Sequence, residues 1–577
     1  MEGEIGNSRI EITKDSVKIT IRKECFGKKR WGQIVELIKL IISGSVGWLI
    51  LPSTIGEGKG GKRWKSKQIE GISYIIYGLM IAPQNKLKRI YKAIDWSKID
   101  EMCEEVYKNE KRGAPAYAPQ MMYRILVLMF YSGTPFESET LRRLETDVLW
   151  RWFVGLGMLS KVPDKGTLSK YRKRIGVERF EKILIGIIEA CDKAGLIGHK
   201  ESFYDMTGVE ASATAMTPYQ RAVILAKAMS KYLEEKGKEA GISKVEIAEI
   251  ALEVLEKKHS SLKKVKAQSV VKSAKSLEEK LETGTKKKPR WWRRLKEKWG
   301  QIRQNWSEDR VEKIAQVREI AEKLVAELPQ TFGNADAKVG RMNKTGTLCG
   351  YRSGFLVDAK KRIITAVIFV AVTSREAPTL LTALSKHQAI FQRYPQRLGL
   401  DAAFDDDEVH RQMALWNIES VTSVRTRTGA KGLFRTNEFV WNEQKQLICP
   451  GGKQMHKCGG PYKNGAERYR PVENCSACPL FQQCLTPKTQ AQKTPLRQID
   501  IKTEAHQRAQ ENRQRCYSPQ GQSLRHRRFA SEGLFGHLNS YHNGDKAPYR
   551  SATMDHIAQL MVASISNLEQ LARHSQT

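Results

Sequence analysis

Three acidic residues stand in separate parts of the chain, each where a carboxylate could hold a metal ion. Asp205 lies in the strand-like run ESFYDM, Asp401 follows the apolar run RLGL, and Glu532 lies in the helix-like run RRFASEGLFGHLN. Carboxylate oxygens are the ligands that Mg²⁺ and Mn²⁺ prefer, and two such ions can activate a hydroxyl nucleophile and stabilise the leaving oxygen of a phosphodiester. The three acids therefore form a candidate catalytic site for two divalent ions.

Taken singly, each acid also has an ordinary structural explanation. Asp205 suits a turn before Thr207, Asp401 suits a helix cap, and Glu532 suits the surface of a helix. The hypothesis depends on the three side chains meeting in space, because long stretches of chain separate them. We interpret the other acids near these segments as turn residues and caps, of which one could assist the metal site; they are Asp336, Asp358, Asp405, Asp406 and Asp407.

Four cysteines form a second candidate site. They are Cys449, in LICPGGKQ, and Cys475, Cys478 and Cys484, in CSACPLFQQC. A Cys-x-x-Cys pair with two further thiolates can bind one tetrahedral ion, so we expect a closed structural Zn²⁺ site. The alternative is four reduced cysteines in a small β structure, and Cys458 or His456 could replace one ligand. A redox role is disfavoured because no thioredoxin-like strand–helix–strand pattern surrounds the pair.

Two basic segments are candidate nucleic-acid contacts. In PDKGTLSKYRKRIG, Thr167 could cap a short helix whose basic residues suit phosphate contacts or groove entry; they are Lys170, Arg172, Lys173 and Arg174. In KKKPRWWRRLKEKWG, cationic groups alternate with indoles that could stack on bases; the candidates are Arg290, Trp291, Trp292, Arg293 and Arg294. A solvated basic face and inward-packed tryptophans are the structural alternatives.

The elements that must position these groups follow from hydrophobic periodicity. Apolar residues recur with helical spacing over about 85–197, which predicts an all-helical domain. Strands are predicted at ESFYDM, at YRSGFLVDAKKRIITAVIFVAV, where a polar AKKR turn joins two of them, at RLGLDAAF and at ESVTSVRTR. Helices are predicted at APTLLTALSKHQAIF, at DDEVHRQMALWN and over about 525–572. This order predicts a mixed α/β sheet with an early antiparallel pair.

The same patterns divide the chain into segments. We expect an N-terminal extension of unknown role over 1–84, a helical domain that binds DNA over 85–198, the first core strand over 199–217, a basic helical insertion over 218–330, the continued core over 331–429, a cysteine-rich insertion over 430–500 and C-terminal helices of the core over 501–577. Within the first segment, RIEITKDSVKITI predicts a β-hairpin and GEGKGGKRWKSK predicts a linker.

Composition narrows the classes of partner and compartment. The 577 residues include 98 Lys and Arg against 63 Asp and Glu, a formal net charge of +35, which favours nucleic acid over a ribosomal or membrane-surface partner. The start MEGEIGNSRIEITKD lacks the pattern of a secretory signal, and charges and glycines interrupt the apolar run 34–51, which is too short to span a bilayer. We therefore expect a cytoplasmic, nucleoid-associated protein without membrane contact.

Four segments resemble the core blocks of bacterial insertion-sequence DDE transposases, whose catalytic domain is ribonuclease-H-like. In order they are FYDMTGVEASA, DAKVGRMNKTGTLCGYRSGFLVDAKKRIITAVIFV, LGLDAAFDDDEV and RRFASEGLFGHLN. The resemblance implies that Asp205, Asp401 and Glu532 are the catalytic acids. Residues 85–198 resemble the N-terminal domain of the same family, and the cysteines lie where a cysteine-rich insertion is common in it. Residues 1–84 and most of 218–330 lie outside the resemblance.

Around the third acid the family has Tyr, Arg, Glu and Lys at set intervals. Arg528 occupies the arginine position, which implies contact with a phosphate at a DNA end. Arg525 stands in place of the tyrosine and Asn539 in place of the lysine, so those two roles are not carried over. Arg525 is still a candidate DNA contact because of its charge.

The resemblance implies an enzyme that binds terminal inverted repeats in double-stranded DNA, cleaves phosphodiester bonds with two Mg²⁺ or Mn²⁺ ions and joins the 3′-hydroxyl ends to target DNA. Because two DNA ends must be held together, it also implies a homodimer or a larger synaptic complex. Two alternatives stay open. One is a ribonuclease-H-like nuclease without strand transfer, and the other is a catalytically inactive or domesticated DNA-binding protein.

Overall fold

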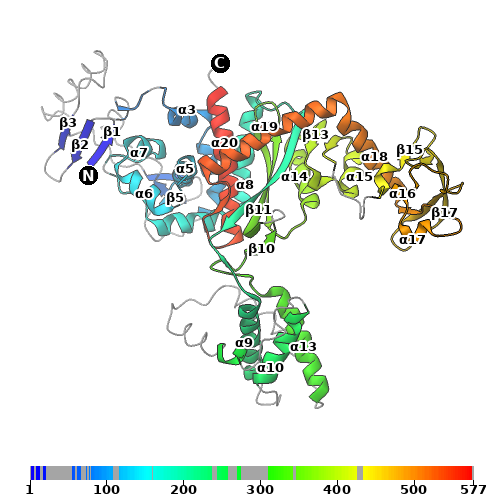
Figure 1. Cartoon of the computed structure of the whole chain (residues 1–577). Helices are drawn as coiled ribbons and strands as arrows, with labels where there is room; N and C mark the ends of the chain where they lie inside the picture. Colours follow the sequence, from blue (N-terminus) through cyan, green and yellow to red (C-terminus); the bar gives the residue numbers. More distant parts are fainter. Residues whose placement is uncertain are drawn as a thin grey trace.

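The computed structural model describes most of the chain (Figure 1). The described residues are 2–5, 8–12, 17–20, 55–58, 62–65, 73, 77, 80–82, 84–107, 116–134, 136–158, 160–236, 244–257, 269–273, 310–341, 346–424 and 433–574. The apolar run 34–51 and the candidate DNA contacts Arg290, Trp291, Trp292, Arg293 and Arg294 lie outside them. Among the helices in the described ranges, none combines the length and apolarity needed to cross a membrane.

The N-terminal extension contains two small sheets. Strands β1 (Glu2–Ile5), β2 (Ser8–Ile12) and β3 (Val17–Thr20) pair antiparallel, which confirms the predicted hairpin. The predicted linker is wrong in part, because β4 (Ile55–Gly58) and β5 (Lys62–Lys65) form an antiparallel pair there. A glycine-rich run reads as a loop by local propensity, but here β5 also pairs with β6 (Ala116–Tyr117), a contact distant in sequence.

A helical domain follows, as its periodicity predicts. Its helices are α3 (Lys86–Ala93), α4 (Ser97–Cys103), α5 (Pro119–Tyr131), α6 (Glu137–Thr146), α7 (Val148–Val154) and α8 (Lys165–Lys193), with a 3₁₀ turn at Glu104–Tyr107. Helix α5 is buried on nearly every side. These helices share one hydrophobic core with the C-terminal helix α20 (Ala552–His574) and with Phe355 and Ile364 of the central sheet. The helical domain is therefore packed directly against the core that follows it.

The start of α8 differs from the prediction. Asp164, and not Thr167, caps the helix, because its carboxylate accepts the backbone N–H of Thr167 at 2.8 Å. The Thr167 hydroxyl donates to the same carboxylate. Gly176, at φ 71°, kinks the helix, so residues 165–175 form a separate first part of it. A backbone with positive φ is one that glycine adopts at little cost.

The central sheet has five main strands in the order β12-β11-β7-β13-β14. They are β7 (Glu201–Ala211), β11 (Thr347–Asp358), β12 (Ile363–Ala371), β13 (Arg397–Leu400) and β14 (Glu419–Thr422). β11 pairs antiparallel with both β12 and β7, whereas β13 runs parallel to β7 and to β14. The short strands β10 (Lys338–Arg341) and β20 (Lys546–Ala547) extend the sheet. The predicted mixed sheet with an early antiparallel pair is confirmed.

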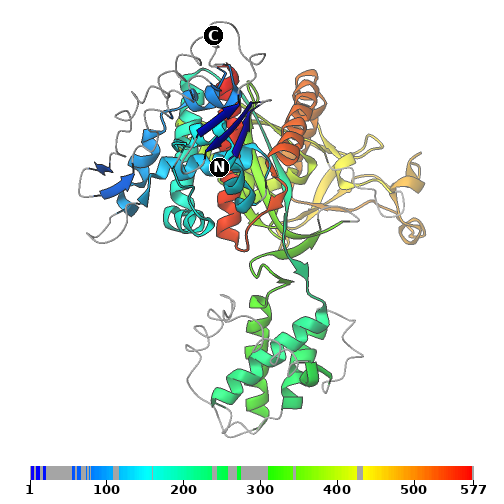
Figure 2. The ribbon, with the colours of Figure 1, turned by 90° about the vertical axis from the view of Figure 1, so that its left-hand side faces the viewer.

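Helices cover both faces of this sheet (Figures 1 and 2). Helices α14 (Glu376–Phe391) and α15 (Asp407–Leu415) pack on one face against Tyr204, Leu356 and Leu398. Helices α8 and α20 lie against β12 on the other. The chain then forms α18 (Thr503–Tyr517) and α19 (Pro519–His542), and α19 runs beside β13 and β7. The C-terminal helices thus begin earlier than the predicted residue 525.

Two insertions leave this core. Helices α9 (Pro218–Lys236), α10 (Lys244–Glu256) and α13 (Arg310–Glu327) form a lobe with its own hydrophobic core, separated from the sheet in both views (Figures 1 and 2). The second insertion is a five-stranded antiparallel sheet with two short helices; the elements are β15 (Val440–Trp441), β16 (Leu447–Ile448), β17 (Gln454–Gly459), β18 (Glu467–Pro471), β19 (Ile499–Ile501), α16 (Phe481–Cys484) and α17 (Pro487–Gln490).

Candidate active site

Strand register places two of the three acids side by side. In the parallel pairing of β13 with β7, Leu400 lies opposite Tyr204. Asp401 and Asp205 are the residues that directly follow this pair, so they lie side by side in adjacent segments of the sheet. Asp401 follows the end of β13. Asp205 is not a turn residue, because β7 continues to Ala211 through its pairing with β11. Asp205 is therefore held within a strand, between β11 and the end of β13.

Arg528 joins the third acid to the first two. Its guanidinium Nη1 lies 3.1 Å from Oδ2 of Asp205, and its Nη2 lies 3.1 Å from Oε1 of Glu532, one turn further along α19. The same Nη2 is 4.0 Å from Oδ1 of Asp401. The side chain of Arg528 is only 13% exposed. The structure thus brings the three predicted acids together around one partly buried cation, although strands and a helix remote in sequence supply them.

Burial makes Asp205 an unusual carboxyl group. The pKa of Asp205 is raised to about 6, mainly by loss of solvent and to a lesser extent by the neighbouring carboxylates of Asp401 and Glu376. The Met206 backbone N–H and the Arg528 guanidinium act in the opposite direction. A cluster of partly buried carboxylates is stable only with a compensating cation or a bound proton.

The donor set fits hard divalent ions. All three candidate ligands offer carboxylate oxygens, which Mg²⁺ and Mn²⁺ prefer. The carboxylate oxygens of the three acids do not all lie within 4.8 Å of one another. In the described ranges, the possible metal ligands that meet this spacing are His537, His542 and Glu569. The Arg528 guanidinium occupies the space between them and supplies the positive charge that an ion would supply.

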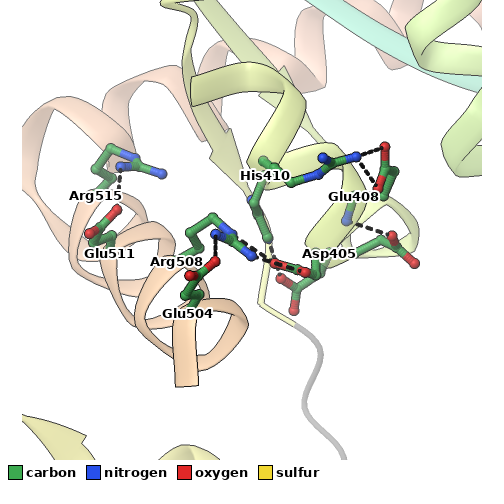
Figure 3. Close-up of polar contacts among 10 residues, drawn as sticks. Asp405, Glu408, His410, Glu504, Arg508, Glu511 and Arg515 are labelled. Carbon is green, nitrogen blue, oxygen red and sulfur yellow. Dashed lines mark hydrogen bonds and ion pairs between the residues drawn. The ribbon is translucent and has the colours of Figure 1, made fainter. Parts of the chain in front are cut away.

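The acids that follow Asp401 form hydrogen bonds and ion pairs within the local structure, in agreement with their interpretation as cap and turn residues. Asp406 caps α15 by accepting the backbone N–H of Glu408 at 3.1 Å. Asp405 accepts a hydrogen bond from His410, and Arg508 of α18 binds Asp407 through two nitrogens, at 2.8 and 3.1 Å (Figure 3). These contacts tie α15 to α18 and so fix the segment that follows Asp401.

Two further acids near the core blocks are also structural. Asp358 is fully buried and accepts the backbone N–H groups of Gly198 and His199 at 3.0 Å each. Asp336 accepts the backbone N–H of Ala552 at the start of α20. Neither lies among the groups that contact Arg528 in the described contacts.

The basic candidates on α8 separate into two kinds. Lys170, Lys173 and Arg174 are exposed. Arg172 does not fit the predicted phosphate contact, because it is 4% exposed, forms an ion pair with buried Glu137 and lies over the Tyr549 ring. Helical spacing explains the difference, since Arg172 shares the inward face with buried Leu168 and Ile175. Arg525, on α19, is partly buried.

The sequence analysis did not identify a basic cleft at the first residues of β7 and β13. A cavity of about 840 Å³ lies between the β11–β12 turn, the start of β7 and α19. Its basic lining residues are Lys200, Lys360, Lys361, Arg362, Arg397, Arg527 and Arg573. Arg397 and Arg527 both pair with Glu201 there. These cations come from five separate segments, so the AKKR turn was their only compact signal in the sequence.

The four predicted zinc ligands line one small pocket. Cys449, Cys475, Cys478 and Cys484 surround a cavity of about 20 Å³, and neither Cys458 nor His456 is among its lining residues. The pKa of Cys484 is raised to about 11, mainly by burial and also by the three other thiols, whereas Arg497 lowers it. The backbone N–H of Lys453 donates to the Cys449 sulfur at 3.4 Å. The thiols face one another around a common space, although their sulfurs are not all within 4.8 Å of one another.

Two family models match parts of the chain. Residues 77–174 match the family model described as "Transposase domain (DUF772)", and residues 448–572 match the model described as "Transposase DDE domain". Both models describe transposase domains, and together they support an insertion-sequence DDE transposase. The second match contains Arg528 and Glu532, whereas Asp205 and Asp401 lie outside both matches.

A DDE transposase domain implies a ribonuclease-H-like fold, and the mixed sheet with helices on both faces is consistent with it. The chain is also similar to the "Uncharacterized protein ORF8 in nfe locus" of Rhizobium meliloti, with 29% identity over 118 residues. That similarity covers 20% of this chain and 56% of the relative, so the chain spans about half of the relative's length. No solved structure gives a significant match.

Proposed function

We propose that the protein cleaves phosphodiester bonds at the ends of an insertion sequence and joins the freed 3′-hydroxyl groups to target DNA. The observation that carries the proposal is the meeting of Asp205, Asp401 and Glu532 within 4.0 Å of one guanidinium. The two family matches support the same chemistry. Double-stranded DNA, first as terminal inverted repeats and then as target, is the proposed substrate.

The three carboxylates would hold two Mg²⁺ or Mn²⁺ ions. When bound, such ions activate a water or 3′-hydroxyl nucleophile and stabilise the leaving oxygen. β7 and the end of β13 fix Asp205 and Asp401, and α19 presents Glu532. Arg528, which neutralises the acids in this state, would be released when ions enter and would be positioned to bind a phosphate of the DNA end.

The surrounding basic surfaces would position the DNA. The cleft that contains Lys360 and Arg573 lies beside α19, and the exposed Lys170, Lys173 and Arg174 lie on α8. Phosphate contacts by such groups fix the register of a duplex without reading its sequence. Because two ends must be cut and joined together, we further propose that the protein acts in the cytoplasm, at the nucleoid, as a homodimer or a larger synaptic complex.

The cysteine-rich insertion would hold one structural Zn²⁺ ion. Its support is the common pocket of Cys449, Cys475, Cys478 and Cys484, since four thiolates make a closed tetrahedral site. Removal of the ion would loosen the sheet β15–β19 and leave the acids in place, because the insertion has its own hydrophobic core around Phe439 and Tyr469.

A strand-transfer assay tests the proposal. The full chain is mixed in Mg²⁺ with DNA ends that already carry a free 3′-hydroxyl, and their joining to plasmid DNA is measured. We expect joining by the parent and its loss, by roughly 10³-fold or more, in Asp401→Asn, because several kcal/mol of transition-state stabilisation depend on the ions. Glu408→Gln, an exposed acid on α15, is the matched control and should retain activity.

The outcomes separate the alternatives. In a parallel reaction with uncut ends, cleavage without any joining of the pre-cut ends would indicate a nuclease of the same fold. If neither cleavage nor joining occurs in Mg²⁺ or Mn²⁺, while the ends are still bound, the chain is a DNA-binding protein without catalysis and the proposal is overturned.

A further inference from the structure

A second cluster of metal-ligating side chains lies between α19 and α20. His537 and His542 of α19 meet Glu569 of α20, and their ligand atoms all lie within 4.8 Å of one another. The Nε2 atoms of His537 and His542 are 3.3 and 3.5 Å from Oε2 of Glu569. Ligands of a tetrahedral ion at about 2.0–2.1 Å stand about 3.4 Å from each other, so both spacings suit one shared ion.

The tautomer of His542 leaves a free lone pair that faces the cluster. Its Nδ1 lies 2.9 Å from the carbonyl oxygen of Phe130, and a carbonyl can only accept, so Nδ1 carries the proton. In the neutral ring Nε2 is then an acceptor. His542 is 1% exposed, and this Nε2 has no hydrogen-bond partner. A buried polar atom without a partner is costly unless something else satisfies it.

The carboxylate is oriented in the same manner. Glu569 is 5% exposed, and its other oxygen, Oε1, accepts from the Lys86 ammonium at 2.7 Å. Hydrogen bonds between outer groups and the remote atoms of a His or a carboxylate are the usual way in which metal ligands are held in place. The side chain of His537 is 39% exposed, so the cluster can be reached from solvent.

We propose that His537, His542 and Glu569 bind a divalent transition-metal ion, of which Zn²⁺ is the best match. Two imidazoles and one carboxylate suit Zn²⁺ better than Mg²⁺, which takes oxygen ligands. The ion would link α19 and α20 directly, and through Lys86 and Phe130 it would also link them to α3 and α5. It would thereby fasten the helical domain to the helix that presents Arg528 and Glu532.

Metal content tests this proposal independently of catalysis. The full chain and its variants are dialysed against micromolar Zn²⁺ with millimolar Mg²⁺, which keeps the carboxylate site supplied with its preferred ion, and zinc per chain is measured by elemental analysis. To remove the contribution of the cysteines, the parent for comparison is Cys475→Ser with Cys478→Ser. We expect this parent to retain one zinc ion per chain.

His537→Asn in that parent should lose this zinc, whereas His526→Asn, a change of an exposed histidine on α19, should retain it. His537 is half-buried and lies outside the hydrophobic core, so we expect its replacement to leave the core intact, and circular dichroism verifies the fold. Zinc should also raise the melting temperature of the parent but not of the His537→Asn variant. The proposal is overturned if the parent holds no zinc, in which case the cluster is an ion pair of Lys86, Glu569 and His542, or if His537→Asn holds as much zinc as the parent.

Discussion

The guanidinium of Arg528 lies 3.1 Å from the carboxylate of Asp205, although more than half of the chain separates the two residues. Strand β7 supplies the acid and helix α19 supplies the base. The same guanidinium contacts Glu532 and approaches Asp401, so its charge stands where paired metal ions would stand. This relationship implies that metal ions bind to the three acids only when the Arg528 guanidinium is released from them.

Asp205→Asn should stabilise the metal-free protein while it abolishes strand transfer. Because folding raises the pKa of Asp205 from 3.8 to about 6, the folded state binds more protons between these values. Its stability must therefore fall as pH rises through this window, at a cost of up to about 3 kcal/mol above it. The variant lacks this cost. Urea unfolding in a chelator, from pH 4 to pH 7, should show a flatter profile for the variant; identical profiles would contradict the account.

Arg528→Gln should separate metal affinity from activity. Without the competing guanidinium, Mn²⁺ should bind the three acids about tenfold more tightly, equivalent to ~1.4 kcal/mol. DNA cleavage should nevertheless fall, since a phosphate contact is lost. Mn²⁺ binding is followed by electron paramagnetic resonance. Arg527→Gln is the control, because Arg527 pairs with Glu201 and not with the three acids; equal gains in both variants would refute the coupling.

Cys478→Ser should reduce the zinc content of the cysteine pocket, and Cys458→Ser should not, because Cys458 is exposed and does not line that pocket. Structural zinc supplies folding free energy, so its loss should expose residues 433–501 to limited proteolysis before the remainder of the chain. Equal zinc content and equal protease resistance in the two variants would exclude the cysteine site.

Neighbouring cations on α8 should respond differently to replacement. Lys173→Ala should weaken DNA binding and reduce the salt dependence of affinity by about one unit of slope, as expected for one lost phosphate contact. Arg172→Ala should instead lower stability, by about 3–5 kcal/mol, because it leaves Glu137 buried without its partner. Fluorescence anisotropy over a salt series and urea unfolding distinguish the two. The assignment fails if Arg172→Ala changes only the salt slope.

The sequence predicted the strands and helices of the core well, because their apolar residues follow regular periods. The strands on either side of the AKKR turn and helix α14 are examples. It did not predict that Arg172 is buried, because a charged residue is normally assigned to the solvent-exposed face of a helix. Arg172 instead lies on the buried face, between Leu168 and Ile175. Nor did it predict the cap at Asp164, which competes with Thr167 for the same helix start.

For the sites too, the sequence predicted candidate residues but not their arrangement in space. Asp205, Asp401 and Glu532 could be chosen as candidates because of a family resemblance, but their meeting is a tertiary fact set by the register of β13 on β7. The cleft around Lys360 and Arg573 arises from segments that have no local relation. The cluster of His537, His542 and Glu569 could not be predicted from the sequence either, because it forms only where α19 and α20 pack together.

The most direct test of the central claim is the anomalous diffraction of Mn²⁺ in crystals of the protein with a DNA end. The account predicts manganese within coordination distance, about 2.0–2.2 Å, of carboxylate oxygens of Asp205, Asp401 and Glu532, with Arg528 displaced toward a phosphate. Manganese bound elsewhere, with Arg528 still between the three acids, would contradict it.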